Sequence, residues 1–360
     1  MTTVERLHAT GILRIGTPRS GFRYRPANGG RVWAEDLERI AQLKIPPAWT
    51  DVAINSATTG RVQVVGQDAA GRWQYLYHES HVRARERKKF ARLIRFGENL
   101  PKLRGAVTRD LKGPGLSRDR VMASILRILD TSFLRPGSEI YASENGSYGI
   151  ATLRPRHVAV KGDVIYFDFK GKSGQQQARE IRDRQVARVL RDLLRHSNRR
   201  VFKYQNEDGG LVDVTSRTIN QSIKELMGRR FTAKDFRTWA GTLICACALA
   251  RSASDPDLKR LPIKRRIRAA INETAAALGN TPAVSRDAYI CPVVISSFER
   301  GEVIDSHFDS LERLIAYRGT DLHRAEKALL KLLRKQSEIP GSSVRDSRVG
   351  EKAHRLGKNP

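Results

Sequence analysis

The stretch from residue 148 to 177, "YGIATLRPRHVAVKGDVIYFDFKGKSGQQQ", decides the fold of this 360-residue chain. It contains two or three runs rich in β-branched and aromatic residues, and the turn sequences "VKGD" and "GKSG" separate them. This pattern is typical of antiparallel strands joined by tight hairpins. We therefore expect a small antiparallel sheet, and the sequence around it indicates that the sheet is set among helices.

Helical periodicity dominates that surrounding sequence. The apolar residues of "VMASILRILDTSF" at 121–133 recur on one face, and Phe236, Trp239 and Leu243 do the same farther along the chain. The amphipathic segments beyond the sheet are "RDRQVARVLRDLL" (182–194), "SRTINQSIKELM" (216–227), "KDFRTWAGTLICACALA" (234–250) and "IKRRIRAAINETAAAL" (263–278). They predict a mainly helical domain at residues 101–335.

The first 80 residues have a different sequence pattern. Short β-like runs, "RVWAEDL" at 31–37 and "RVQVVGQD" at 61–68, alternate with the turn sequences "PANGG" and "DAAGR". They predict a small β-rich domain at residues 1–80. The fold class expected for the whole chain is therefore α+β.

Two basic segments lie outside these domains. In "HESHVRARERKKFARLIRFGENLPKLR" at 78–104, the segment Arg83 to Lys89 carries five cations and one Glu. Such a helix is either a solvated surface or a clamp on a duplex, since each phosphate that it neutralises releases counterions. We expect a basic helical linker at residues 81–100. Residues 336–360, rich in Gly, Ser, Arg and Lys, are expected to form a basic flexible tail.

The charge of the chain favours a nucleic-acid partner. The 66 Lys and Arg residues exceed the 38 Asp and Glu residues, which gives a net charge of +28 and a sequence pI near 10.6. This excess suits a polyanion better than a neutral small molecule. An architectural DNA-binding protein would have the same charge. Only the candidate catalytic residues can therefore distinguish an enzyme that acts on DNA from an architectural protein.

Composition argues against membranes, disulfides and metals. The longest strongly apolar block, "LICACALA" at 243–250, is far shorter than the ~20 residues of a membrane span, and no N-terminal run resembles a signal peptide. We expect a cytoplasmic protein. Three cysteines form neither a disulfide framework nor a four-ligand zinc site, and no clustered Cys or His completes a metal set with His78 and His81. We expect no cofactor.

One reaction accounts for several residues together, namely the attack of a phenol on a phosphodiester. The charge on the phosphate oxygens must be stabilised, the departing sugar oxygen must gain a proton, and the phenol, with a pKa of about 10, must lose one. The residue types that meet these needs occur in the order Arg135, Lys172, Arg237, Asn280 and Tyr289. Taken singly, Tyr289 also fits a packed aromatic and Lys172 a solvated turn residue. A P-loop at "GKSG" would need Gly at the position of Tyr166.

In the sequence stretches that surround these residues, the chain resembles the type IB DNA topoisomerases, specifically their short bacterial and poxviral branch. The stretches that carry the resemblance are "KIPPAWTDVAI" (44–54), "WQYLYHESHV" (73–82), "LRPGSEIYASENGSYGIATLRPRHV" (134–158) with "DFKGKSG" (168–174), "KDFRTWAGT" (234–242) and "LGNTPAVSRDAYI" (278–290). The resemblance implies a β-rich N-terminal DNA-clamp domain and a mainly helical catalytic domain with a small antiparallel sheet, the catalytic fold that tyrosine recombinases share.

The same resemblance implies roles for the five residues. Tyr289 would be the nucleophile that forms a 3′-phosphotyrosyl bond, Arg135 and Arg237 would hold the non-bridging oxygens, and Lys172 would be the general acid. Two positions depart from the family pattern. Asn280 replaces the histidine of the poxviral enzymes, so it can donate a hydrogen bond but cannot carry a charge. Pro136 follows Arg135 where an aliphatic residue is usual, and biases Arg135 toward an extended backbone.

The resemblance also implies contacts with duplex DNA. The residues expected to make them are Gln74, Tyr75, Tyr77, Tyr141 and Lys234. Alternation along a strand places Tyr75 and Tyr77 on the same side, on a face that is either core or DNA groove.

The alternatives are a tyrosine-type site-specific recombinase and an architectural protein. Recombinases typically have a histidine three residues before the second arginine, where this chain has Lys234. An architectural protein would not need the five residues in these contexts. We therefore expect a monomeric, nucleoid-associated enzyme that relaxes supercoiled DNA without ATP, metal or a small-molecule substrate.

Overall fold

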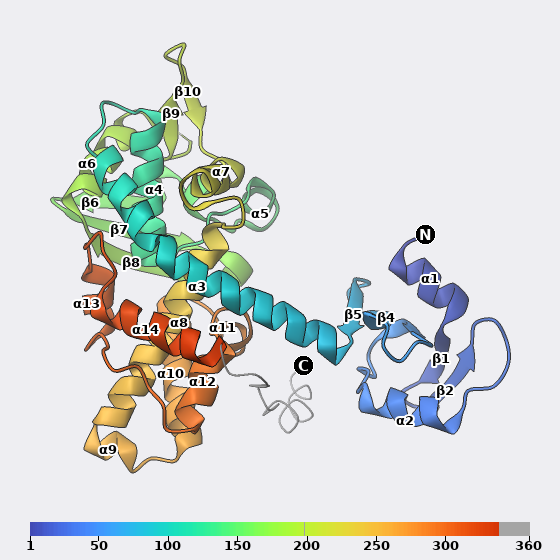
Figure 1. The fold of residues 1–360 in the computed structure, drawn as a ribbon. Helices are drawn as coiled ribbons and strands as arrows, with labels where there is room; N and C mark the ends of the chain where they lie inside the picture. The colour runs from blue at the N-terminus through green and yellow to red at the C-terminus, as the bar shows by residue number, and fades with distance from the viewer. Residues whose placement is uncertain (198, 338–360) are drawn as a thin grey trace. The chain divides into compact units, whose positions relative to one another are not determined.

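The computed structural model describes residues 1–197 and 199–337, and its contacts divide the chain into two units, residues 1–89 and 90–360. The first unit is rich in strands, and the second is mainly helical with small antiparallel sheets (Figure 1). The expected α+β class is confirmed. No helix of the described residues is long and apolar enough to cross a membrane.

The first unit is built on an antiparallel sheet of five strands in the order β2-β1-β3-β4-β5. Leu7 of α1 packs against Ala53 and Val65 on one face of the sheet, and Ile40 of α2 packs against Ile54 on the other. The elements are α1 (Thr3–Thr10), β1 (Ile12–Thr17), β2 (Gly21–Pro26), α2 (Ala34–Gln42), β3 (Thr50–Ile54), β4 (Val62–Gln67) and β5 (Trp73–Tyr77). Helices therefore cover both faces of the sheet.

One local prediction for this unit is wrong. The run "RVWAEDL" was expected to be β-like, but α2 begins at Ala34 within it. Glu35 and Asp36 lie in the first turn of α2, where acidic side chains interact favourably with the helix dipole. The apolar Val and Trp at the start of the run suggested a strand, yet they only precede the helix.

The basic segment forms part of one continuous helix, α3 (Glu79–Asp110), which crosses the boundary between the two units. The predicted linker 81–100 lies inside this helix, and the domain boundaries stay a prediction. The side chains at positions 83, 85–87 and 90 lie outside the described structure, so the role of the segment Arg83 to Lys89 also stays a prediction. Of the predicted tail, residues 338–360 lie outside the described residues.

The second unit contains the predicted hairpins. Strands β6, β7 and β8 form an antiparallel sheet in chain order. Gly162 in "VKGD" has φ of +58°, and the tip at "GKSG" contains Ser173 with φ of +59°. The strands of the unit are β6 (Val158–Lys161), β7 (Val164–Lys170), β8 (Gln176–Arg182), β9 (Lys203–Gln205) and β10 (Leu211–Asp213), with 3-10 turns η1 (Ile150–Thr152), η2 (Pro155–His157) and η3 (Lys172–Gly174).

The predicted helices are also present. After α3 they are α4 (Arg118–Ser132), α5 (Glu139–Asn145), α6 (Arg184–Arg195), α7 (Ser216–Met227), α8 (Ala233–Ser254), α9 (Pro256–Lys259), α10 (Ile263–Leu278), α11 (Pro282–Ala288), α12 (Pro292–Glu299), α13 (Leu311–Ala316) and α14 (Arg324–Ser337). Helix α8 begins with a capping box of Thr232 and Asp235. It packs against α4, α7, α10, α12 and α14, so it is the central helix of this unit (Figure 1).

Two glycines of α3 give a matched test of this packing. A Cβ on Gly97 would meet the ring of Trp239 on α8, and Leu330 Cδ2 on α14 at 3.0 Å, whereas a Cβ on Gly105 would meet nothing within 4 Å. A helical Gly→Ala change gains about 1 kcal/mol where there is room, while overpacking costs about 1–3 kcal/mol. We expect Gly97→Ala to lower the free energy of unfolding in urea by about 1–2 kcal/mol, and Gly105→Ala to raise it slightly. Equal effects of the two changes would contradict this packing.

Candidate active site

The backbone that carries Arg135 is fixed by close glycine contacts. Helix α4 ends at Ser132, and Phe133 turns the chain with φ of +58°. The carbonyl of Arg135 accepts a hydrogen bond from the Ile150 N–H at 2.9 Å. A Cβ on Gly149 would meet that same carbonyl oxygen at 2.7 Å, so this position requires glycine. The carbonyl of Pro136, the departure from the family pattern, accepts from Ala151 N–H at 2.8 Å.

Arg237 lies near the start of α8 and is 2% exposed. Its guanidinium donates to the carbonyl of Phe133, just after α4, and to the carbonyl of Leu278, the last residue of α10, at 2.9 Å. One buried cation therefore holds together the ends of two helices. The chain segments that follow those ends carry Arg135 and Asn280.

Tyr289 directly follows α11 and is 9% exposed. Its backbone approaches α8 closely, because a Cβ on Gly241 would meet the Tyr289 carbonyl oxygen at 3.0 Å. The Cys291 N–H donates to Thr242 Oγ1 at 3.1 Å, which fixes the chain just after the tyrosine. Sequence reasoning gave Gly241 and Thr242 no role, although both lie in the quoted stretch "KDFRTWAGT".

The arginines control the ionisation of Tyr289. The Arg237 guanidinium carbon lies 4.8 Å from the centroid of the Tyr289 ring. Burial raises the pKa of Tyr289, but Arg237 and Arg135 together outweigh burial, so this pKa lies below its ordinary value. Burial, and then repulsion from Arg135, lower the pKa of Arg237 to about 10. At neutral pH Arg237 therefore remains a cation, and the two arginines make Tyr289 easier to ionise than an ordinary tyrosine.

Asn280 joins this group through Arg135, whose guanidinium donates to Asn280 Oδ1. Asn280 Nδ2 and Arg237 Nε are buried, and neither has a hydrogen-bond partner among the described residues. Buried donors without a partner cost about 1–3 kcal/mol each and call for an explanation. Two cations act on the Tyr289 phenol, and the two buried donors belong to one of these arginines and to the asparagine bonded to the other, so the group is suited to an anion.

No hydrogen bond or ion pair joins Lys172 to these four residues within the described part of the chain. Lys172 lies exposed in η3 at the tip of the β7–β8 hairpin, and its side chain makes no hydrogen bond or ion pair within the described part of the chain. The β7–β8 hairpin is held against the segment after α10 by the side chain of Gln177. Gln177 on β8 is 3% exposed, and its side chain fills the space that a Cβ on Gly171 or on Gly279 would occupy.

Arg179, also on β8, is a third arginine near the site that sequence reasoning missed. Its guanidinium donates to the Ala277 carbonyl at 3.0 Å. Burial lowers the pKa of Arg179, and its charge contributes to lowering the pKa of Arg237. Gln177 and Arg179 share the more buried face of β8 with Ile181, but the polar sequence "QQAREIR" has no apolar alternation that would have marked this face.

The residues expected to contact DNA lie in both units. On β5, an edge strand, the rings of Tyr75 and Tyr77 stack with centroids 6.3 Å apart, which confirms that they share one side. The neighbouring Gln74 amide donates to Asp68 at 2.9 Å. In the second unit, Tyr141 on α5 is 60% exposed, and Lys234 is exposed in the first turn of α8.

Comparisons with known proteins agree with this fold. A family model described as "Eukaryotic DNA topoisomerase I, catalytic core" matches residues 79–293, and one described as "Bacterial DNA topoisomerase IB, N-terminal domain" matches residues 21–68. The DNA topoisomerase 1B of Acanthamoeba polyphaga mimivirus is 37% identical over 304 residues, which cover 83% of this chain and 90% of the relative. The DNA topoisomerase 1B of vaccinia virus (strain Copenhagen) is 24% identical over 281 residues, or 74% of this chain and 83% of the relative.

These matches define the chain as a DNA topoisomerase, a DNA-binding isomerase. It belongs to the type IB family, and it fits the short bacterial and poxviral branch that the sequence resembles.

Proposed function

We propose that the protein relaxes supercoiled duplex DNA by cutting one strand through a 3′-phosphotyrosyl bond to Tyr289, letting the duplex rotate, and resealing the strand. The observation that carries this proposal is the group of Arg135, Arg237 and Asn280 around a buried tyrosine whose pKa is lowered. A phosphoryl group in this position would meet two cations and two unpaired N–H donors. Such donors stabilise the charge that develops in the transition state.

The ionisation of Tyr289 supports its role as nucleophile. Free tyrosine has a pKa of about 10, so only a small fraction is phenolate near pH 8. Arg237 and Arg135 lower the pKa of Tyr289 despite its burial, which increases that fraction. The same cations can then neutralise the phosphate as the phenolate attacks.

The energetics of the exchange require no nucleotide. Transfer of the phosphodiester to Tyr289 exchanges one phosphoester bond for another, so resealing by the free 5′-hydroxyl needs no ATP. Supercoiling strain drives the rotation between the two steps.

We propose that the cations meet the electrostatic needs of the reaction without a metal. We also propose that a monomer performs the reaction on the nucleoid in the cytoplasm. The net charge of +28 supports the DNA partner.

Lys172 is the proposed general acid that protonates the departing 5′ oxygen. Lys172 lies on an exposed hairpin tip, and we propose that its ammonium group reaches the phosphate in the complex with DNA. Catalytic contacts often tighten only in the substrate complex. The positive φ values of Ser173 and Gly174 give the tip its tight turn.

The general-acid role predicts a dependence on the leaving group. We expect Lys172→Ala to slow single-turnover cleavage of an ordinary phosphodiester by about 10²–10⁴-fold. A substrate with a 5′-bridging phosphorothiolate has a leaving group that needs no proton, so its cleavage should slow far less. The measurement is the rate of covalent complex formation on both substrates, with Lys170→Ala as a control on the same hairpin. Equal slowing of both substrates would remove Lys172 from this role.

Relaxation of negatively supercoiled plasmid in EDTA without ATP tests the proposed function as a whole. We expect a ladder of topoisomers that converges on the relaxed form. Plasmid that is bound but stays supercoiled would contradict the proposal.

A further inference from the structure

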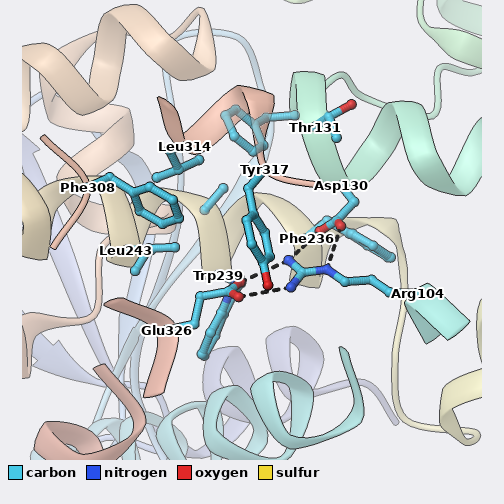
Figure 2. A pocket seen from close by; sticks show the side chains of 12 residues that line it. Arg104, Asp130, Thr131, Phe236, Trp239, Leu243, Phe308, Leu314, Tyr317 and Glu326 are labelled. Carbon is cyan, nitrogen blue, oxygen red and sulfur yellow. Dashed lines mark hydrogen bonds and ion pairs between the residues drawn. The ribbon is translucent and has the colours of Figure 1, made fainter. Parts of the chain in front are cut away.

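The second unit contains a buried charged cluster that includes none of the five predicted site residues. It is formed by Arg104 of α3, Asp130 of α4 and Glu326 of α14. Figure 2 shows the Arg104 side chain between the two carboxylates. Arg104 forms two hydrogen bonds of 2.9 Å with Glu326, and its Nε donates to Asp130 at 2.9 Å. Its side chain is 11% exposed and that of Glu326 is 2% exposed.

The hydrogen bonding of this cluster is complete around Arg104. The remaining contacts of its guanidinium, both 3.4 Å, are with the second Asp130 oxygen and with the Asp321 carbonyl. All five N–H donors of the guanidinium therefore have an acceptor. Burial lowers the pKa of Arg104, but the two carboxylates outweigh it and raise the pKa above its ordinary value. The cluster is a fixed ionic junction of three helices.

Glu326 extends the junction to a fourth helix. Its Oε1 accepts from the indole Nε1 of Trp239 on α8 at 3.2 Å, and its Oε2 accepts from the His323 N–H at 2.9 Å. Each carboxylate oxygen thus accepts from Arg104 and from one further donor. Glu326 lies beyond residue 293, where the match to the catalytic-core family model ends.

The junction reaches both proposed catalytic arginines through short stretches of chain. Asp130 lies in the last turn of α4, and the nearby Phe133 carbonyl accepts from Arg237 before the chain continues to Arg135. Trp239 lies on α8 two positions after Arg237. The spacing between the end of α4 and the start of α8 is therefore held on one side by Arg237 and on the other by the cluster.

The cavity at this junction does not fit a ligand. Its volume is about 20 Å³, which holds about one water molecule. Its apolar lining includes Phe133, and Phe236 and Phe308 are seen beside it in Figure 2. The cavity leaves no room for a ligand, and every N–H donor of Arg104 already has an acceptor. The junction is therefore suited to holding the helices in fixed positions.

We propose that Glu326, acting through Arg104, Asp130 and Trp239, is a positioning residue that sets the placement of Arg135 and Arg237 around Tyr289. The inference rests on the proposed function of that site. It assigns a part in the reaction to α14, a helix that lies after the family-model match and contributes none of the five predicted site residues.

Three variants test this role. Glu326→Gln keeps the size of the side chain but turns an N–H₂ group toward N–H donors. Trp239→Phe removes the indole donor together with part of a buried side chain, and keeps one aromatic ring at this position. Glu302→Gln is the matched control: Glu302 accepts from Lys335 and Gln336 of α14 at 2.7 and 2.8 Å and has no bond to α4 or α8.

The first readout is the pKa of Tyr289, measured by an NMR titration of protein labelled at tyrosine Cζ, with the Tyr289 signal assigned by its loss in Tyr289→Phe. If the junction holds the arginines in place, Glu326→Gln and Trp239→Phe raise this pKa, and Glu302→Gln leaves it unchanged. The second readout is single-turnover cleavage of a short duplex, which we expect to slow about 10–100-fold in the first two variants, with the Kd for DNA within about threefold.

The outcomes separate this proposal from the proposed function. A Tyr289 pKa and a cleavage rate that match the Glu302→Gln control in both variants, with only a lower Tm, would overturn the positioning role. Absence of cleavage by the unaltered protein would refute the proposed function instead, and the NMR titration would still decide whether Glu326 positions the arginines.

Discussion

Tyr289→Phe is expected to bind duplex DNA normally, form no covalent complex and relax no plasmid. The change removes one hydroxyl and keeps the ring that lies 4.8 Å from the Arg237 guanidinium carbon, so packing and charge around the site stay in place. Loss of a nucleophile of this kind lowers a rate by on the order of 10⁵–10⁶-fold. The measurements are covalent complex formation on a short duplex and relaxation of supercoiled plasmid over several hours.

Tyr166→Phe is the control for this prediction. Tyr166 is 36% exposed on β7, and removal of its hydroxyl should leave relaxation unchanged. Relaxation at the unaltered rate by Tyr289→Phe would show that another residue is the nucleophile, and the assignment of the site would have to be abandoned.

Arg237→Ala is expected to have the next largest effect. The side chain supplies the main charge that lowers the pKa of Tyr289, and we propose that it also holds the phosphate. Loss of one preorganised donor costs about 10²–10³-fold in rate, so the loss of a buried cation should slow cleavage by at least about 10²-fold. The rate of covalent complex formation checks this, after a melting curve has shown that the variant is folded.

The pH dependence of the same variant gives a second check. With Arg237 removed, burial of Tyr289 is less opposed, so its pKa rises. The rising limb of cleavage rate against pH should therefore move to higher pH, because a higher pH is needed for the same fraction of phenolate. Arg237→Lys keeps a cation without the planar fork and should lie between the alanine variant and the unaltered protein. An unshifted limb in Arg237→Ala would show that this arginine does not control Tyr289.

The strongly periodic parts of the fold were predictable from the sequence. The hairpins of residues 148–177 and the helix bearing Phe236 and Trp239 have clear apolar periods, and the structure confirms both. The strand expected at "RVWAEDL" was wrong, because its apolar residues precede a helix start that the acidic first turn favours. The short run "RVQVVGQD" was predicted correctly and contains β4, so the error at "RVWAEDL" came from the helix start and not from the length of the run.

The sequence proposed the residues of the candidate site, whose roles stay a prediction, but it did not give their geometry. The structure links Arg135 to Asn280 and places Arg237 against the Tyr289 ring, while Lys172 lies on an exposed hairpin tip. The shared contacts of Arg237 with the ends of α4 and α10 depend on tertiary packing. For the same reason no sequence pattern indicated Glu326, whose partners lie on helices far apart in the chain.

Identification of the residue that carries the DNA tests the central claim most directly. A duplex whose cleaved end diffuses away would trap the covalent complex, and digestion by trypsin and nuclease would leave a nucleotide on one peptide. Peptide 287–300, "DAYICPVVISSFER", contains a single tyrosine. We predict that this peptide carries the nucleotide, that fragmentation places it on Tyr289, and that the linkage is to a 3′ phosphate. A nucleotide on any other residue, or a 5′ linkage, would contradict the account.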